Sequence, residues 1–118
     1  MTPANAPASP SAPAALPKIL SGQKALVTGA HSGIGEGVAL ALGEAGADVC
    51  VNYVDGDDAA QAVVEKLQGF GVNAFAHKAD VSDENQVAAM FKAAVERFGT
   101  VDILVANAGL QRDAAFHT

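Results

Sequence analysis

The chain has 118 residues, of which 50% are apolar and 5% aromatic, and its formal net charge at pH 7 is −6. This length is enough for one small domain, whose core alanine, valine and glycine must build. An acidic surface argues against nucleic acid and anionic membranes as partners, because both select a basic patch. The single cysteine, Cys50, excludes an internal disulfide and fits a reducing compartment. We therefore expect a soluble cytoplasmic protein.

The composition changes after residue 17. Ala, Pro, Ser, Thr and Asn make up nearly all of residues 1–17, and all five prolines of the chain lie there. Proline removes backbone donors and small side chains bury little surface, so we expect a disordered tail over residues 1–17. This tail has neither the basic flank nor the apolar segment of a signal peptide. No apolar run in the chain reaches the roughly 20 residues of a membrane-spanning helix.

Short apolar runs alternate with segments of helical periodicity from residue 18 onward. Strands are expected at residues 24–28, 48–53, 73–77 and 102–106. Apolar side chains recur at helical spacing over residues 34–45, 63–70 and 87–98. Glycines that permit a left-handed helix end follow these segments, at Gly46, Gly69 with Gly71, and Gly99. Ser82 or Asp83 can cap the third helix.

The order of these elements is β-α-β-α-β-α-β. Crossovers of this length join parallel neighbouring strands through right-handed connections. We therefore predict an α/β fold, namely a Rossmann-type doubly wound parallel sheet that is limited in this chain to about four strands and three helices. Residues 18–118 form the predicted dinucleotide-binding domain, which we expect to be incomplete at its C-terminus.

The turn after the first expected strand carries the main functional signal, Thr-Gly-Ala-His-Ser-Gly-Ile-Gly over residues 28–35. Gly29 allows a tight turn, Gly33 lets the backbone approach a pyrophosphate, and Gly35 lets the new helix pack closely on the sheet. Backbone N–H groups near Ser32 to Ile34 then face the phosphates, and the Ser32 hydroxyl can add a donor. A helix that only follows a tight turn, without binding a ligand, would use similar glycines. The spacing of the glycines here, G-x-x-x-G-x-G, also departs from G-x-G-x-x-G.

This loop and two later segments together resemble the short-chain dehydrogenases/reductases. The resemblance runs over about residues 20–116 and is carried by the glycine loop, by Asp80 and Val81 after the third expected strand, and by Asn107, Ala108 and Gly109 after the fourth. In the family an acid at the first place hydrogen-bonds the adenine amino group. The second segment is similar to the family's Asn-Asn-Ala-Gly, although Ala106 replaces the first asparagine. Several stretches are most similar to members of glucose 1-dehydrogenase type.

The resemblance implies an NAD(P)-dependent oxidoreductase that moves hydride between a nicotinamide and a hydroxyl or carbonyl of an alcohol or sugar. It also implies a homodimer or homotetramer and a strand order of 3-2-1-4. The family's catalytic residues are a Ser, a Tyr and a Lys four residues after the Tyr. Tyr53 is the only tyrosine here and is followed four residues later by Asp57, so no catalytic residue can be named. The chain is expected to hold the cofactor-binding half and to be inactive alone.

The choice between NAD and NADP depends on the end of the second expected strand. NAD binders usually place an acid there, and NADP binders a basic residue. Asn52, Tyr53 and Val54 fit neither pattern, and the next acid is Asp55. No Lys or Arg occurs between residues 24 and 66 to neutralise a 2′-phosphate, so the sequence favours NAD. Tyr53 and Asp55 complete the expected set of cofactor-binding residues.

Other interpretations remain open at this stage. A non-catalytic dinucleotide-binding module or inactive fragment would keep the glycine loop without a Tyr/Lys pair. A methyltransferase also uses a glycine-rich first turn. Asp80 can serve simply as a turn residue beside Ser82. His31, His77 and His117 lack the spacing of metal ligands, so no metal site is expected.

Overall fold

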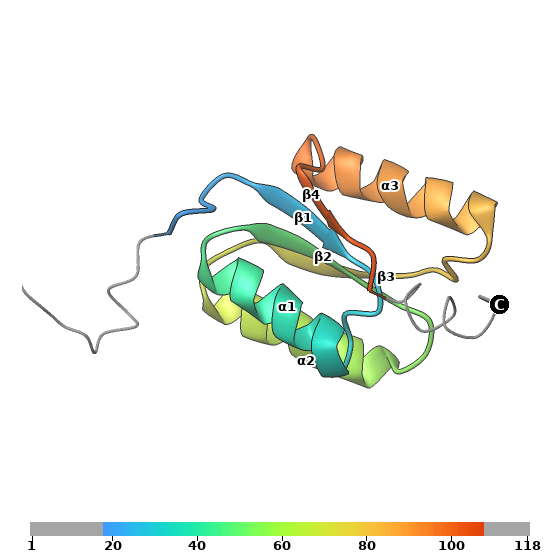
Figure 1. Cartoon of the computed structure of the whole chain (residues 1–118), viewed down its shortest axis with the longest axis horizontal. Helices are drawn as coiled ribbons and strands as arrows, with labels where there is room; N and C mark the ends of the chain where they lie inside the picture. The colour runs from blue at the N-terminus through green and yellow to red at the C-terminus, as the bar shows by residue number, and fades with distance from the viewer. Residues whose placement is uncertain (1–17, 108–118) are drawn as a thin grey trace, which may run out of the picture.

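A parallel four-stranded sheet with helices on both faces makes up residues 18–107, the part of the chain that this computed structural model describes. The strands are β1 (Lys24–Val27), β2 (Asp48–Tyr53), β3 (Ala74–Lys78) and β4 (Ile103–Val105). The helices between them are α1 (Gly33–Glu44), α2 (Asp57–Gly69) and α3 (Glu84–Phe98). The order across the sheet is β3-β2-β1-β4, as the resemblance implied (Figure 1). The predicted tail over residues 1–17, Ala108 and Gly109 lie outside the described residues.

The strands in the middle of the sheet are apolar because both of their faces are covered. In β1 and β2, Leu26 lies opposite Cys50 and Val27 opposite Val51, and all four side chains are fully buried. Parallel strands that are covered on both faces have near-continuous apolar sequences, and this explains the short apolar runs in the sequence of these strands. β1 also pairs with β4, and β2 with β3, so β3 and β4 are the two edges of this sheet.

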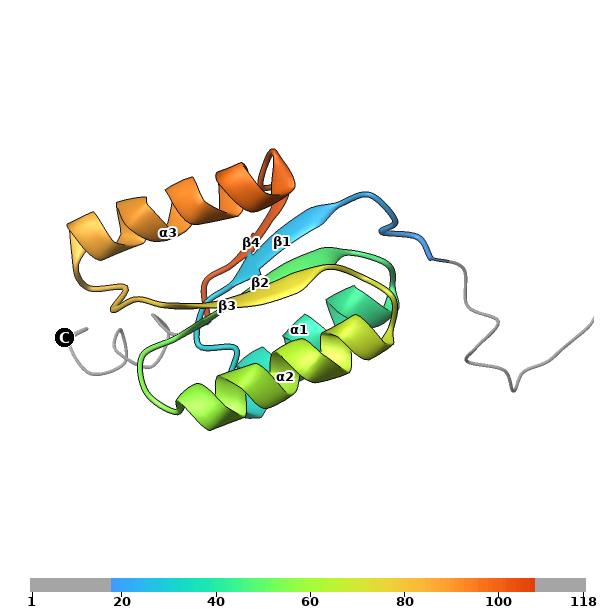
Figure 2. The same ribbon diagram turned by 180° about the vertical axis from the view of Figure 1, so that it is seen from behind.

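The sheet separates two apolar cores. Helices α1 and α2 cover one face and α3 covers the other, as both views show (Figures 1 and 2). On the α1/α2 side, Val49, Val51 and Leu67 belong to one buried cluster. On the α3 side, Cys50 and Met90 belong to a second. Alternate residues of β2 therefore serve different cores, as the side-chain period of two in a strand requires.

The helix ends agree with the sequence analysis in part. Asp83, rather than Ser82, caps α3, because its carboxylate accepts from the backbone N–H of Asn85 at 2.9 Å and of Gln86 at 3.2 Å. Left-handed glycines follow each helix, at Gly46, Gly71 and Gly99. The expectation that Gly69 would also close a helix was wrong, since Gly69 is the last residue of α2 and Gly71 takes the positive φ. None of the three helices has the length and apolar composition needed to cross a membrane.

Candidate functional site

The predicted site residues come together at one edge of the sheet. Gly29 follows β1, Tyr53 ends β2, Asp80 follows β3 and Asn107 follows β4. Because all four strands are parallel, their carboxyl ends meet at the same edge, where open α/β sheets bind ligands. Residues that are almost 80 positions apart in sequence are thus brought together, as the 3.3 Å hydrogen bond from Asn107 Nδ2 to the backbone carbonyl of Gly29 shows.

The glycine loop turns off β1 and presents the start of α1 to open space. Gly29 and Gly33 both have φ of 61°, a left-handed conformation that favours glycine. A β-carbon on Gly33 would meet nothing within 4 Å, so the backbone is bare where α1 begins. Ser32 is the exposed N-cap residue, and its side chain makes no capping hydrogen bond. The first N–H groups of α1 and the positive end of its dipole therefore face open space, which is the arrangement found in anion-binding sites at helix starts.

Gly35 holds the loop and the helix together by having no side chain. A β-carbon there would overlap the carbonyl of Gly29 and lie 2.8 Å from Asn107 Nδ2. Gly35 is buried, whereas its neighbour Ile34 is 78% exposed and contributes its backbone only. Each glycine therefore has a different geometry, which matches its predicted role: Gly29 forms the tight turn, Gly33 leaves the backbone bare and Gly35 allows close packing.

The carboxyl end of β2 carries no basic side chain. The side chain of Asn52 is turned into the protein and fully buried, while Tyr53 is half-buried and Val54 and Asp55 are exposed. Partial burial of the Tyr53 hydroxyl, and then the charge and hydrogen bond of the Asp57 carboxylate, raise the pKa of Tyr53. The side chains of this strand end are therefore neutral or acidic, although Lys78 of β3 lies opposite Tyr53 on the neighbouring strand, and Tyr53 stays protonated at neutral pH.

Asp80 lies in the turn between β3 and α3. Its Oδ1 accepts from the backbone N–H of Ser82 at 2.9 Å and from the Ser82 hydroxyl at 2.7 Å. Its own N–H donates to Gln86 Oε1 at 2.8 Å. Asp80 therefore shapes the turn, as the structural interpretation predicted, and these bonds also fix the carboxylate at the ligand-binding edge. The next residue, Val81, is half-buried and packs against the core under α3.

The sequence analysis did not predict that Asn52 connects the glycine loop with the end of β3. Its Oδ1 accepts from the backbone N–H of Gly29 at 3.1 Å, and its Nδ2 donates to the carbonyls of His77 at 3.3 Å and Ala79 at 3.1 Å. The available signal was an amide inside an otherwise apolar strand, because a buried polar side chain needs partners.

His31 lies in the glycine loop beside the start of α2. A β-carbon on Gly56, the left-handed residue that precedes α2, would lie 3.4 Å from His31 Cδ2. His31 Nδ1 is the one buried side-chain nitrogen or oxygen atom in residues 18–107 that lacks a hydrogen-bond partner. Over the same residues, no group of three or more His, Cys, Asp and Glu is arranged to hold a metal ion.

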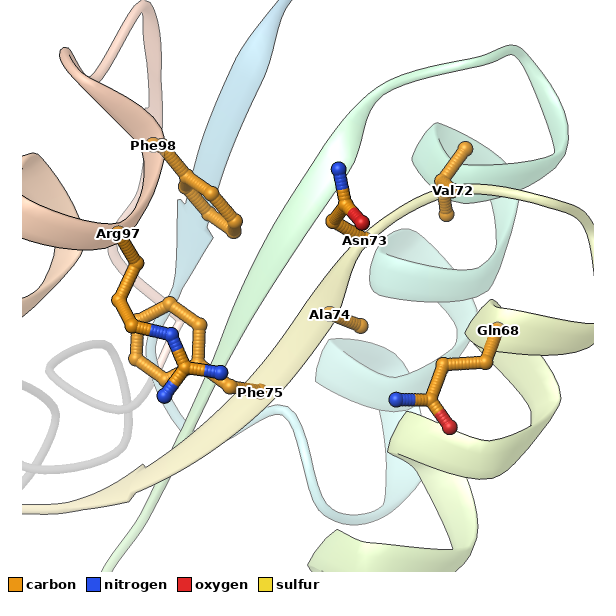
Figure 3. Close-up of a pocket in the computed structure, with 7 residues that line it drawn as sticks. All are labelled: Gln68, Val72, Asn73, Ala74, Phe75, Arg97 and Phe98. Atoms are coloured by element: carbon orange, nitrogen blue, oxygen red, sulfur yellow. The ribbon is translucent and has the colours of Figure 1, made fainter.

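A groove of about 340 Å³ lies at the opposite end of the sheet. It straddles the start of β3 and is bordered by Gln68 of α2 and Arg97 of α3 (Figure 3). The Arg97 guanidinium lies 4.3 Å from the ring centroid of Phe75, and this ring packs edge-on against Phe98. The groove is remote from the glycine loop, and a charged side chain over an open sheet edge is a common protection against strand pairing.

Comparisons with known proteins agree with this geometry. The profile of the family described as "short chain dehydrogenase" matches residues 23–118. The chain is 50% identical over 91 residues to a 3-oxoacyl-[acyl-carrier-protein] reductase FabG of Staphylococcus aureus, covering 77% of this chain and 37% of that protein. A hydroxysteroid dehydrogenase from Escherichia coli has a similar structure, with a TM-score of 0.71 and 39% identity over 75% of this chain and 37% of its own.

A short chain dehydrogenase from Burkholderia cenocepacia, solved in complex with NADP, is similar to the same degree. Its TM-score is 0.71, with 41% identity over 73% of this chain and 35% of that one. The chain thus spans a little over a third of the length of the curated relatives and solved structures that it matches.

Proposed function

Because this chain belongs to the short chain dehydrogenase family, we propose that it forms the cofactor-binding part of an NAD(P)-dependent oxidoreductase. The observation that carries this proposal is the bare start of α1, where Gly33 leaves open space between the first helical N–H groups and the ligand edge of the sheet. The proposal extends to hydride transfer between the cofactor and a hydroxyl or carbonyl group. The bound nicotinamide supplies the hydride chemistry.

The described residues suit the adenosine diphosphate part of a dinucleotide. The N–H groups near Ser32 to Ile34 would hold the pyrophosphate, which carries the negative charge that a helix start favours. Asp80 would accept from the adenine amino group, and Val81 would lie beside the ring. Tyr53 and Asp55 would face the adenosine ribose. The remaining proposed cofactor-binding residues are Gly29, Gly33, Gly35, Asn107, Ala108 and Gly109.

Binding of the adenosine diphosphate part is the direct test of this proposal. We expect the chain to bind ADP-ribose weakly, because the proposed cofactor-binding residues would contact only the adenosine diphosphate end of a dinucleotide. Gly33→Val should abolish binding by placing a side chain in the open space and by straining a backbone with φ of 61°. Gly37→Val is the matched control, since Gly37 lies on the same helix with nothing within 4 Å of a β-carbon. A folded chain without calorimetric heat at millimolar ADP-ribose would contradict the proposal.

NAD is the proposed cofactor in preference to NADP. The support is electrostatic, because Val54 and Asp55 are exposed at the end of β2 and Lys66, the lysine of α2, pairs with Glu36 at 3.3 Å. Lys78 lies opposite Tyr53, one strand away from this end of β2. A 2′-phosphate beside Asp55 would be repelled. We expect Val54→Arg to improve NADP binding about tenfold or more, the effect of one charge-assisted hydrogen bond. Val54→Gln is the uncharged control, and tighter binding of NADP than of NAD by the unmodified chain would contradict the proposal.

The substrate, location and assembly of the whole enzyme belong to the same proposal. We propose a sugar or alcohol substrate of the glucose 1-dehydrogenase type, a cytoplasmic location and a homodimer or homotetramer, on the resemblance of segments such as Val-Cys-Val-Asn-Tyr. The similarity to a 3-oxoacyl reductase supports a carbonyl substrate of another class. Joining residues 18–107 to the second half of a relative and comparing glucose with a 3-oxoacyl thioester would separate the two. We propose that the chain alone is inactive, because it contains no Tyr followed four residues later by Lys.

A further inference from the structure

Gly29, the first glycine of the loop, is held through both of its backbone polar groups by side chains from other strands. Its N–H donates to Asn52 Oδ1 at 3.1 Å, and its C=O accepts from Asn107 Nδ2 at 3.3 Å. Asn52 belongs to β2 and Asn107 follows β4, and the strands β2 and β4 are the two neighbours of β1 in the sheet. The loop is therefore braced from both sides at the point where it leaves β1.

Asn52 has no solvent contact and uses its whole side chain in this brace. The two Nδ2 bonds, to His77 O at 3.3 Å and Ala79 O at 3.1 Å, reach the end of β3, and the Oδ1 bond reaches the glycine loop. The Asn52 backbone carbonyl also accepts from the N–H of Ala30 at 2.9 Å. One residue thus connects the loop proposed to bind phosphate with the residue that precedes Asp80.

Packing alone does not explain an amide at this position. Cys50 lies two residues earlier on the same face of β2 and fills its place as a small apolar side chain. An apolar side chain at position 52 would leave the Gly29 N–H and two carbonyls without these bonds, and buried polar groups that lose their partners destabilise a fold. The asparagine is therefore matched to the loop and to β3.

We propose that Asn52 is a positioning residue, which presets the glycine loop and the Asp80 turn for the two ends of an adenosine diphosphate. The inference rests on the proposed function, because it assigns the brace to dinucleotide binding. A loop held in its binding geometry before the ligand arrives loses less conformational entropy on binding. Asn52 itself touches no ligand and acts through Gly29 and Ala79.

Two adjacent amides allow a test that needs no ligand. We expect Asn52→Leu to speed hydrogen exchange of the Gly29 N–H at least tenfold, while the Ala30 N–H, which bonds to the backbone of residue 52, stays protected. Asn52→Asp keeps the acceptor for Gly29 and should keep its protection. Unchanged Gly29 exchange in folded Asn52→Leu would overturn the brace. If that variant does not fold, Asn52→Ser, whose hydroxyl is too short to reach, provides the same comparison.

The second measurement addresses binding. Among folded molecules, we expect ADP to bind Asn52→Leu at least tenfold more weakly than the unmodified chain, about 1.4 kcal/mol. Cys50→Ala, a buried change on the same face that touches neither loop, should leave the affinity within twofold. Equal losses in the two variants would overturn the positioning role. If the unmodified chain did not bind ADP but kept the Gly29 exchange pattern, the proposed function would fail and the brace would stand.

Discussion

Lys24 and Asp48, the first residues of the neighbouring strands β1 and β2, form an ion pair with Nζ 2.6 Å from Oδ2. The other carboxylate oxygen accepts from the backbone N–H of Asn73 at 2.9 Å, so a single side chain joins the starts of three strands. Burial alone would raise the pKa of Asp48, but the hydrogen bonds from Lys24 and Asn73 and the lysine charge outweigh it, so the pKa of Asp48 lies below its usual range.

The ion pair predicts acid sensitivity. Because the Asp48 carboxyl has a lower pKa folded than unfolded, its contribution to stability is complete above about pH 4 and is lost as the pH falls through the folded pKa. Asp48→Asn should lower the free energy of unfolding by about 1.5–3 kcal/mol at pH 7 and flatten its decline below pH 4. Urea unfolding between pH 2.5 and 7 checks this, with the exposed Glu65→Gln as control. Parallel pH curves for Asp48→Asn and the unmodified chain would contradict it.

Two glycines of α1 should respond in opposite ways to alanine. A β-carbon on Gly43 would overlap Leu67 Cδ2 of α2, and Leu67 is fully buried among the core residues under α1 and α2. We expect Gly43→Ala to destabilise the fold by about 1–3 kcal/mol through overpacking. Gly37 is exposed with nothing near a β-carbon, so Gly37→Ala should stabilise by up to about 1 kcal/mol through helix propensity. The two midpoints of urea unfolding should lie on either side of the unmodified value, and shifts of the same sign would refute the prediction.

Cys50 should behave as an inert thiol. Burial raises its pKa to about 12, and the charge of Arg97 offsets only part of that effect. At pH 8 about one thiol in ten thousand is ionised, and the thiolate is the reactive form. We expect iodoacetamide to modify the chain only after unfolding in urea. Modification of the native chain at the rate of free cysteine would show that the strand under α3 opens readily.

The edge strand β4 should promote association. Leu104 is 54% exposed, and β4 pairs only with β1 within the described residues. An exposed apolar edge with unpaired backbone groups is a template for strand pairing between molecules. Leu104→Lys should raise the monomer fraction measured by light scattering. Lys92→Gln on the exposed face of α3 serves as a control, and equal association of Leu104→Lys and the unmodified chain would contradict the prediction.

The elements were predictable because each depends on local sequence patterns. The run from Asp48 to Tyr53 is bounded by a glycine before it and by Asp55 and Gly56 after it, and β2 occupies those six residues. The first glycine loop was predictable for the same reason, since its left-handed positions at Gly29 and Gly33 admit few other residues. The exact ends of the strands were less predictable, since β3 begins and ends one residue later than the sequence indicated.

The contacts of the site were not predictable, because they join residues from different strands. Nothing near Asn52 in sequence shows that its amide meets Gly29 and Ala79. The same holds for Asp48, whose sequence position suggested only the start of a strand. Gly69 shows the limit of a local rule, because either of two nearby glycines could end α2 and the sequence does not show that Phe70, which packs against the core, is the C-cap residue between them.

The two faces of the sheet differ in how many apolar side chains they bury. The cluster under α1 and α2 contains eleven fully or nearly buried side chains, and the cluster under α3 contains six. Regions with less buried apolar surface open locally at a lower free energy than the whole fold. α3 should therefore leave the sheet as a separate cooperative unit, and the bond from Asp80 to Gln86 would break with it. During such openings the Asp80 turn would lose its support from α3, while the bonds of Asn52 to Gly29 and Ala79, which lie within the sheet, would keep the glycine loop and the end of β3 in place.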